Sequence, residues 1–197
     1  MDLEKKIIGV GGNARSGKDT LASNLVSILA ELNIKAEKVS FANALRQSVD
    51  DFLLRELGIS AFTEDKKEKD IIRPFLVFWG TDIMRRRDED VWVKKLQSSL
   101  KENQVNIISD LRFTNELDWI QNNNGVSVML SRPNANPANK YEEEENKKLR
   151  QSVNLKFSLA DLKKENRDYI LKSVSHEILN SLLTEETLDL WKATCPL

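Results

Sequence analysis

The sequence is poor in the residues that carry redox and metal chemistry. A single cysteine, Cys195, excludes an intrachain disulfide and a metal site built from several cysteines. The one histidine, His176, has no second histidine with which to share a metal ion, so a packed or surface role is favoured. Chemistry must therefore come from carboxylates, basic side chains, hydroxyls and the backbone.

The sequence also lacks an excess of charge of one sign and lacks long apolar runs. The 30 lysines and arginines nearly balance the 31 aspartates and glutamates, so no overall field draws the protein to nucleic acid or to a membrane. No apolar run approaches the roughly 20 residues of a membrane span, and residues 1–6 lack a signal-peptide pattern. We therefore expect a cytoplasmic protein whose residues 1–197 fold as one domain.

Glycine is scarce but concentrated in one place. Four of the seven glycines lie between Gly9 and Gly17, and the residues from Gly12 onward read G-x-x-x-x-G-K. An apolar run precedes this loop and an amphipathic segment follows it, which predicts a strand, a P-loop and a helix. Backbone N–H groups and the helix N-terminus would surround phosphate oxygens, and Lys18 would add a positive charge. The predicted ATP-binding residues are Gly12, Asn13, Ala14, Arg15, Ser16, Gly17, Lys18, Asp19, Thr20 and Arg132.

One position departs from the strict P-loop pattern, which has Ser or Thr directly after the lysine. Asp19 stands there, and Thr20 follows it. We expect Thr20 to bind an inner phosphate at the magnesium site and Asp19 to reach Mg²⁺ through water. Residues 9–14 also fit G-x-G-x-x-A, the dinucleotide-binding pattern. That alternative gives Lys18 no role and lacks an acidic residue at the end of the second strand, so the P-loop is favoured.

Apolar runs and helical patterns alternate along the chain. This alternation predicts an α/β fold, a P-loop NTPase-like three-layer sandwich whose mostly parallel central sheet of about five strands is flanked by helices. One helix should follow the second strand and end at Gly58. Another should close the chain at 174–183. Strands are expected at 7–10, 35–41, 105–110, 126–130 and 168–171.

Asp110 ends the third predicted strand in a position that resembles a Walker B aspartate. Ligands of open α/β sheets bind at the carboxyl ends of the strands, so Asp110 and Lys18 can share one crevice. We expect Asp110 to orient Mg²⁺ through its water shell. The alternative is a turn or capping residue.

Three blocks resemble the bacteriophage-type deoxynucleoside monophosphate kinases. They are residues 16–20, residues 79–85 together with Trp92, and residues 109–116. The family typically carries Asp-x-Arg-Phe-Pro-Asn-Glu after its third strand, and Thr114 replaces the proline here. The stretch 40–46 is also similar, and the likeness fades beyond Pro133.

The resemblance implies transfer of the γ-phosphoryl group of ATP to a deoxynucleoside 5′-monophosphate, with Mg²⁺ as cofactor. It implies a region at about 41–103 that binds the monophosphate. Residues 133–150 are either a lid or a solvated loop and helix. Guanidinium groups bind phosphate oxygens bidentately, which makes arginines candidate clamps. The catalytic candidates are Lys18, Asp110, Arg112 and Arg85. The substrate-binding candidates are Phe41, Arg46, Arg73, Trp79, Thr81, Arg85, Arg112, Asn115 and Glu116, with core packing the alternative for the aromatics.

The arginines at 85–87 cannot share one role. Consecutive helical residues point roughly 100° apart, so a single cleft cannot face all of them. The family block falls on Arg85, which nominates it for phosphate binding. Arg87 lies beside Asp88 and Glu89 in the sequence and is better suited to surface pairing.

Two other functions stay open. One is a P-loop kinase for a different small phosphate acceptor, such as dephospho-coenzyme A or phosphomevalonate. The other is a non-enzymatic nucleotide-binding switch. Nucleotides are the expected partners, without nucleic acid or membrane. Base preference, ribose selectivity and homodimer formation stay open as well.

Overall fold

The computed structural model describes residues 6–133, 135, 140–159 and 167–183. Contacts within the chain divide it into two units. The sheet unit consists of residues 1–39 and 101–197, and the helical unit of residues 40–100. The helical unit nearly coincides with the region at 41–103 that the family resemblance implies. Its role in binding stays a prediction.

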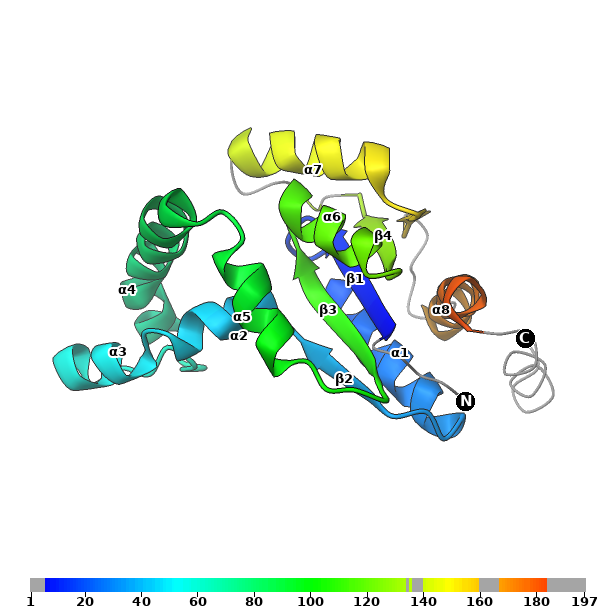
Figure 1. Ribbon diagram of the computed structural model, residues 1–197, viewed down its shortest axis with the longest axis horizontal. Coiled ribbons are helices and arrows are strands. Elements are labelled where there is room, and N and C mark those ends of the chain that lie inside the picture. The colour runs from blue at the N-terminus through cyan, green and yellow to red at the C-terminus, as the bar shows by residue number, and fades with distance from the viewer. Residues whose placement is uncertain (1–5, 134, 136–139, 160–166, 184–197) are drawn as a thin grey trace. The chain divides into compact units, whose positions relative to one another are not determined.

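The sheet unit is built on parallel strands in the order β2-β3-β1-β4-β5 (Figure 1). The central strand β1 pairs with β3 on one side and with β4 on the other, and its Ile8 lies opposite Ile107 and Val126. These strands are buried almost throughout, as expected of a parallel sheet covered on both faces. Their bounds are β1 Lys6–Gly12, β2 Ala36–Val39, β3 Val105–Leu111, β4 Val126–Ser131 and β5 Leu155–Ser158.

Helices cover both faces of this sheet. On one face, α1 (Lys18–Glu31) and α8 (Arg167–Leu182) contact each other, and their apolar side chains share a core with Ile8 and Val10. On the other face, α6 (Thr114–Asn122) and α7 (Lys140–Ser152) contact each other and β1. Gly9 faces α6, because a Cβ there would overlap the side chain of Ile120. The predicted three-layer α/β sandwich is confirmed.

The helical unit has a smaller core of its own. Buried Val49, Leu53, Ala61 and Ile72 form its centre, and Phe75 packs against them. Asp65 caps the longest of its α-helices by accepting hydrogen bonds from the N–H groups that follow it. The elements are α2 Phe41–Gln47, α3 Asp50–Leu57, α4 Lys66–Val77, the π-helix η1 Phe78–Arg85 and α5 Val91–Ser99.

The π-helix η1 is fixed by its neighbours in the helical unit. The indole Nε1 of Trp92 donates a hydrogen bond of 3.1 Å to the carbonyl of Gly80. Gly80 is buried, and a Cβ there would overlap the side chain of Leu45 on α2. The glycine thus lets α2 approach closely while Trp92 holds the widened turn.

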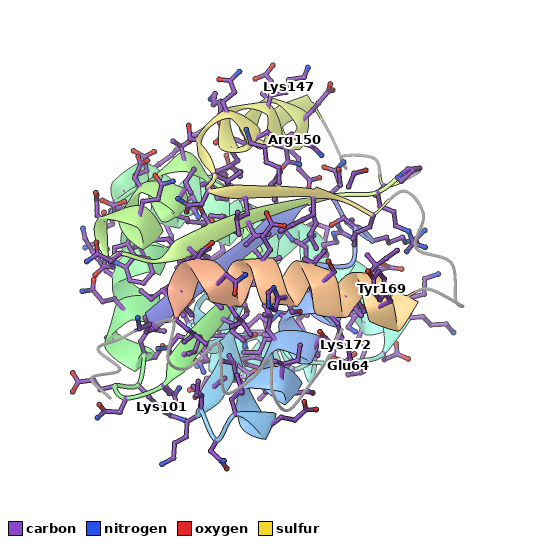
Figure 2. All side chains as sticks on the ribbon, turned by 90° about the vertical axis from the view of Figure 1, so that its right-hand side faces the viewer. Glu64, Lys101, Lys147, Arg150, Tyr169 and Lys172 are labelled. Atoms are coloured by element: carbon purple, nitrogen blue, oxygen red, sulfur yellow. The ribbon has the colours of Figure 1, made fainter. Side chains whose placement is uncertain are left out.

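Three predicted elements are wrong in kind or extent. Residues 168–171 do not form a strand, since they begin α8, whose exposed Tyr169 is labelled in Figure 2. The fifth strand is β5 instead. The predicted helix after β2 is divided into α2 and α3, although Gly58 does end α3 in the left-handed conformation. The second strand stops at Val39, and Ser40 caps α2 by accepting from Asn43 N at 3.1 Å.

Candidate functional site

The loop between β1 and α1 has the tight backbone that its glycines predict. Gly12 adopts a φ of 141°, and a Cβ there would overlap the carbonyl oxygen of Leu130 on β4. Gly17, with a φ of 101°, precedes the first turn of α1. Arg15 also has a positive φ, of 63°. The loop therefore has a backbone conformation that side chains at Gly12 and Gly17 would disfavour.

The start of α1 is suited to an anion. No side chain caps this helix, so the N–H groups of its first turn have no side-chain acceptor among the described residues. The helix dipole adds partial positive charge at the same end. The hydroxyl oxygen of Ser16 is buried beside Gly12 and has no hydrogen-bond partner in the described part of the chain. Phosphate oxygens would satisfy these donors.

Lys18 is folded back against the loop. Its amine donates hydrogen bonds of 2.7 Å to the carbonyls of Gly12 and Asn13. Burial lowers the pKa of Lys18, and the charge of Arg112 lowers it further, whereas Asp19, Glu142 and Asp110 act in the opposite direction. Bound phosphates would also raise this pKa, because negative charge near the amine favours its protonated form.

Asp110 and Arg112 lie near Lys18, as the shared edge of the sheet predicts. Asp110 is half-buried in β3, which is hydrogen-bonded to β1. Both charges act on the amine of Lys18. The structure therefore brings the sheet unit's main catalytic candidates together, and their catalytic roles stay predictions.

The metal candidates provide carboxylates without a closed cage. Asp19 is exposed and pairs with Lys38 on β2 at 2.8 Å. Thr20 lies half-buried in the first turn of α1. No cluster of three acidic, histidine or cysteine side chains occurs among the described residues. One or two carboxylates near a phosphate site fit Mg²⁺, which keeps several of its waters and is completed by substrate phosphates.

Glu116 has backbone partners. It is buried at the start of α6, and its carboxylate accepts hydrogen bonds from Arg112 N at 2.8 Å and Phe113 N at 3.1 Å. It thereby braces the turn that follows β3 and carries Arg112. This is a structural role, and substrate contacts by Glu116 and its half-buried neighbour Asn115 stay predictions. Arg132 is exposed just after β4.

The aromatic candidates belong to packed regions of the helical unit. Phe41 is buried at the start of α2. Trp79 stacks on Phe75 with ring centroids 6.3 Å apart, and Phe75 stacks on Phe52 at 5.6 Å. The indole Nε1 of Trp79 is buried without a partner among the described residues. These contacts support the alternative of core packing for both aromatics.

The arginine candidates of the helical unit differ in exposure. Arg85 is half-buried, and its guanidinium donates to the carbonyl of Glu89 at 3.3 Å. Arg46 is half-buried on α2, whereas Arg73 is exposed on α4. Thr81 lies half-buried in η1. The block 79–85 lies wholly within the π-helix η1, a rare kind of element that is frequent at functional sites.

Sequence reasoning missed a contact between the P-loop and α7. Asn146 Nδ2 donates to Asn13 Oδ1 at 2.6 Å, across 133 positions of the chain. No motif marks Asn146, and only the approximate lid range, 133–150, included it. The structure describes α7 as a helix here, while residues 134 and 136–139 of that range lie outside the described residues.

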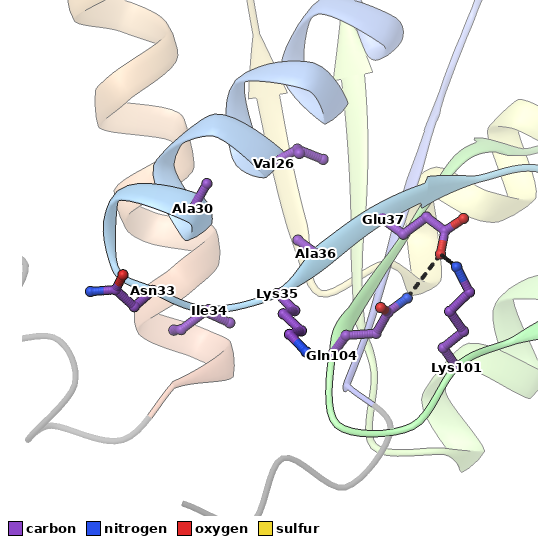
Figure 3. A pocket seen from close by; sticks show the side chains of 9 residues that line it. All are labelled: Val26, Ala30, Asn33, Ile34, Lys35, Ala36, Glu37, Lys101 and Gln104. Carbon is purple, nitrogen blue, oxygen red and sulfur yellow. Dashed lines mark hydrogen bonds and ion pairs between the residues drawn. The ribbon is translucent and has the colours of Figure 1, made fainter.

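A surface groove of about 510 Å³ lies elsewhere in the sheet unit (Figure 3). It is formed where α1 ends and β2 begins, and Lys101 and Gln104 both bond Glu37 there, at 2.8 and 3.1 Å. These donors lower the pKa of Glu37. The groove is at the amino end of β2, whereas the P-loop follows the carboxyl end of parallel β1. It is separate from the phosphate site.

A glycine loop of this conformation, set between a buried strand and an uncapped helix and contacted by a half-buried lysine, defines a nucleotide-binding P-loop protein. The model of the phosphomevalonate kinase family matches residues 10–126, more than half of the chain. The chain belongs to this family of P-loop kinases and is a phosphotransferase.

A relative and two solved structures are also similar. The chain is 30% identical over 149 residues to a protein of Acanthamoeba polyphaga mimivirus named “Putative deoxynucleotide monophosphate kinase”, covering 64% of this chain and 74% of the viral protein. Shikimate kinase from Acinetobacter baumannii in complex with shikimate is 14% identical, with a TM-score of 0.48 and 91% and 96% of the two chains covered. APS kinase from Mycobacterium tuberculosis is 12% identical, with a TM-score of 0.41 and 90% and 97% covered. No described helix is long and apolar enough to cross a membrane.

Proposed function

We propose that the protein transfers the γ-phosphoryl group of ATP to a deoxynucleoside 5′-monophosphate, which gives the diphosphate and ADP. The observation that carries this proposal is the gathering of Lys18, Asp110 and Arg112 around the uncapped end of α1. Phosphoryl transfer needs positioning and cations around developing charge, with little covalent chemistry from the protein. The acceptor class is supported by the viral relative's name and by the block 109–116.

Each residue of the loop has a defined task in this proposal. The amides of residues 13–20 hold the donor phosphates, and Lys18 leaves the carbonyls of Gly12 and Asn13 to bind the transferred group. Asp110 and Asp19, both through water, and Thr20 would hold Mg²⁺. When bound, the metal neutralises charge on the phosphates. Arg112, on the turn braced by Glu116, binds the transferring group.

We assign the acceptor to the helical unit. Arg46, Arg73, Arg85 and Thr81 supply donors suited to a phosphate monoester, and a deoxynucleotide has one at its 5′ position. The buried Phe41 and the half-buried Trp79, which stacks on Phe75, would border this region. The nucleotide substrates favour a cytoplasmic location, which imaging of a tagged chain would test. Light scattering would decide between a monomer and a homodimer.

A second acceptor is favoured by one specific observation. The matched family model describes phosphomevalonate kinase. Phosphomevalonate is also a phosphate monoester, so the same donor site would serve both reactions, and only the contacts beyond the phosphate would differ. Dephospho-coenzyme A and the non-enzymatic switch lack a comparable observation.

Measurement of ADP release over a panel of acceptors tests the proposal. The panel contains deoxynucleoside and ribonucleoside monophosphates, phosphomevalonate, dephospho-coenzyme A and a blank. We expect deoxynucleoside monophosphates to give the largest kcat/KM. The Lys18→Ala protein, purified in the same way, is the control for contaminating kinases. Preference for phosphomevalonate would replace the proposed acceptor, and hydrolysis that no acceptor stimulates would favour a switch.

A further inference from the structure

Helix α7 presents a buried face to the rest of the sheet unit. Glu145, Asn146 and Leu149 are buried, and helical spacing of three or four residues places Leu149 on the same face as the other two. Glu144 and Lys147 are exposed, and Figure 2 labels Lys147 on the outside of the helix. Polar side chains on a buried face need hydrogen-bond partners, so their contacts show which parts of the sheet unit α7 packs against.

Asn146 meets the P-loop through Asn13. Asn13 Nδ2 donates to the carbonyl of Ala135 at 2.5 Å, and its Oδ1 accepts from Asn146 Nδ2 at 2.6 Å. A carbonyl can only accept, so the contact with Ala135 fixes which end of the Asn13 amide faces Asn146. Asn146 must therefore be the donor, and both ends of the Asn13 amide are held by residues more than 120 positions away.

The backbone of Asn13 carries the link onward to the catalytic lysine. Its carbonyl accepts from Lys18 Nζ at 2.7 Å and from Ser16 N at 3.2 Å. Asn13 therefore makes both contacts: its side chain bonds to α7, and its carbonyl accepts a hydrogen bond from the amine of Lys18. A shift of Asn13 would move both the lysine and the loop amides.

Helix α7 also touches the first residue of α6, directly after the turn that follows β3. Glu145 Oε2 lies 3.5 Å from the hydroxyl of Thr114, a long and weak contact, and its other oxygen pairs with Lys148 at 2.7 Å. Thr114 stands where the family pattern has a proline, which could not donate. Earlier on the helix, the charge of Glu142 acts on Lys18. The helix thus lies against both loops that carry the candidate catalytic groups.

We propose that Asn146 is a positioning residue for phosphoryl transfer: through its hydrogen bond to Asn13 it sets the P-loop conformation that receives the nucleotide phosphates. Asn146 does not itself touch the nucleotide. The inference rests on the proposed function only in taking ATP as the donor. It is independent of which acceptor the enzyme uses.

A double-mutant cycle tests this link. ATP and ADP binding are measured by calorimetry without acceptor, and KM for each substrate by steady-state kinetics, for Asn146→Ala, Asn13→Ala and the double variant. We expect each single variant to bind ATP up to about tenfold more weakly, the scale of one buried hydrogen bond. KM for the acceptor should stay unchanged. The double variant should bind no more weakly than Asn13→Ala, because Asn146 acts through Asn13.

Asn146→Asp gives a second test with nearly unchanged shape. Its carboxylate would face Asn13 Oδ1 without a proton to donate, so ATP binding should weaken at least as much as in Asn146→Ala. Gln151→Glu is the matched control, because it adds the same charge at an exposed position of α7. Additive losses in the cycle, unchanged ATP binding, or equal losses in the control and Asn146→Asp would overturn the proposal. The deciding readout is the affinity for ATP and ADP measured without acceptor, so a wrong acceptor assignment would leave that result intact.

Discussion

The two units carry their candidate residues in different ways. In the sheet unit, Lys18 begins α1 after the loop that follows β1, and Asp110 lies near the carboxyl end of β3, the neighbour of β1. The backbone of the loop supplies much of the candidate phosphate site. In the helical unit, Arg46, Arg73 and Arg85 come from separate helices. A site made by strand ends and backbone is set by topology, whereas one made by side chains on helices depends on individual residues. Donor binding and acceptor selectivity should therefore respond differently to mutation.

The largest effect is expected at the backbone-built site. Lys18→Ala should reduce kcat by about 10²–10³-fold, because a donor aimed at developing charge is lost. Circular dichroism should show an intact fold, and Lys147→Ala, which removes an exposed lysine of α7, is the control for charge. Near-normal turnover in the Lys18→Ala enzyme would refute the P-loop assignment.

The acceptor site can be tested with neighbouring arginines. Arg85→Ala should cost at least about 2 kcal/mol in kcat/KM if its guanidinium contacts phosphate, whereas loss of an exposed ion pair costs typically under 1 kcal/mol. Arg87 is exposed and provides the matched control. Steady-state kinetics with the preferred acceptor, together with thermal unfolding of both variants, make the comparison. Equal activities, or the reverse order, would show that a different face of this helix serves the acceptor.

A substitution of Glu116 tests whether its carboxylate stabilises the turn after β3. Glu116→Gln keeps the shape but removes the charge that accepts two backbone hydrogen bonds, so the free energy of unfolding should fall by about 1.5–2 kcal/mol. Urea unfolding measures this change. Glu144→Gln, at an exposed position of α7, should be nearly neutral. Similar stability of both variants would argue against a bracing role.

The smallest effect is expected at the π-helix. Trp92→Phe keeps most of the buried aromatic surface and removes the hydrogen bond to the Gly80 carbonyl, so stability should fall by about 1 kcal/mol. Unfolding monitored by circular dichroism gives the value. Acceptor KM should rise with it if η1 presents the acceptor residues. If only the affinity for ATP changed, Trp92 would support the ATP site and not the acceptor site.

The sheet was largely predictable because its strands have a simple signature. β1, β3 and β4 are short apolar runs, and the glycine loop fixes where β1 ends. β5 is not predicted because it is an edge strand of four residues, Leu155–Ser158, in which half-buried and exposed positions alternate. The run at 168–171 resembles a strand, but Leu171, Val174 and Ile178 recur at helical spacing and form the buried face of α8.

The rest of the site depends on contacts that no local pattern encodes. Gly80 and Trp92 could be singled out from the family block, but the hydrogen bond that joins them and the close approach of Leu45 to Gly80 are tertiary contacts. Asn146 likewise depends on a tertiary contact, because its partner, Asn13, lies in the P-loop. Sequence periodicity indicates which face of a helix is buried, and it does not indicate which polar residue finds a partner there.

The strand order also bears on how the chain acquires its structure during synthesis. The central strand β1 ends at Gly12, yet its neighbours β3 and β4 begin only at Val105 and Val126. Residues 40–100 form a continuous unit with a core of their own, so they can complete their contacts first. The P-loop can take its final shape only later, because the pairings of β1 with β3 and with β4 both close long loops of the chain. A nascent chain released before residue 126 would therefore contain the whole G-x-x-x-x-G-K motif but lack β4, one of the two strands that pair with β1.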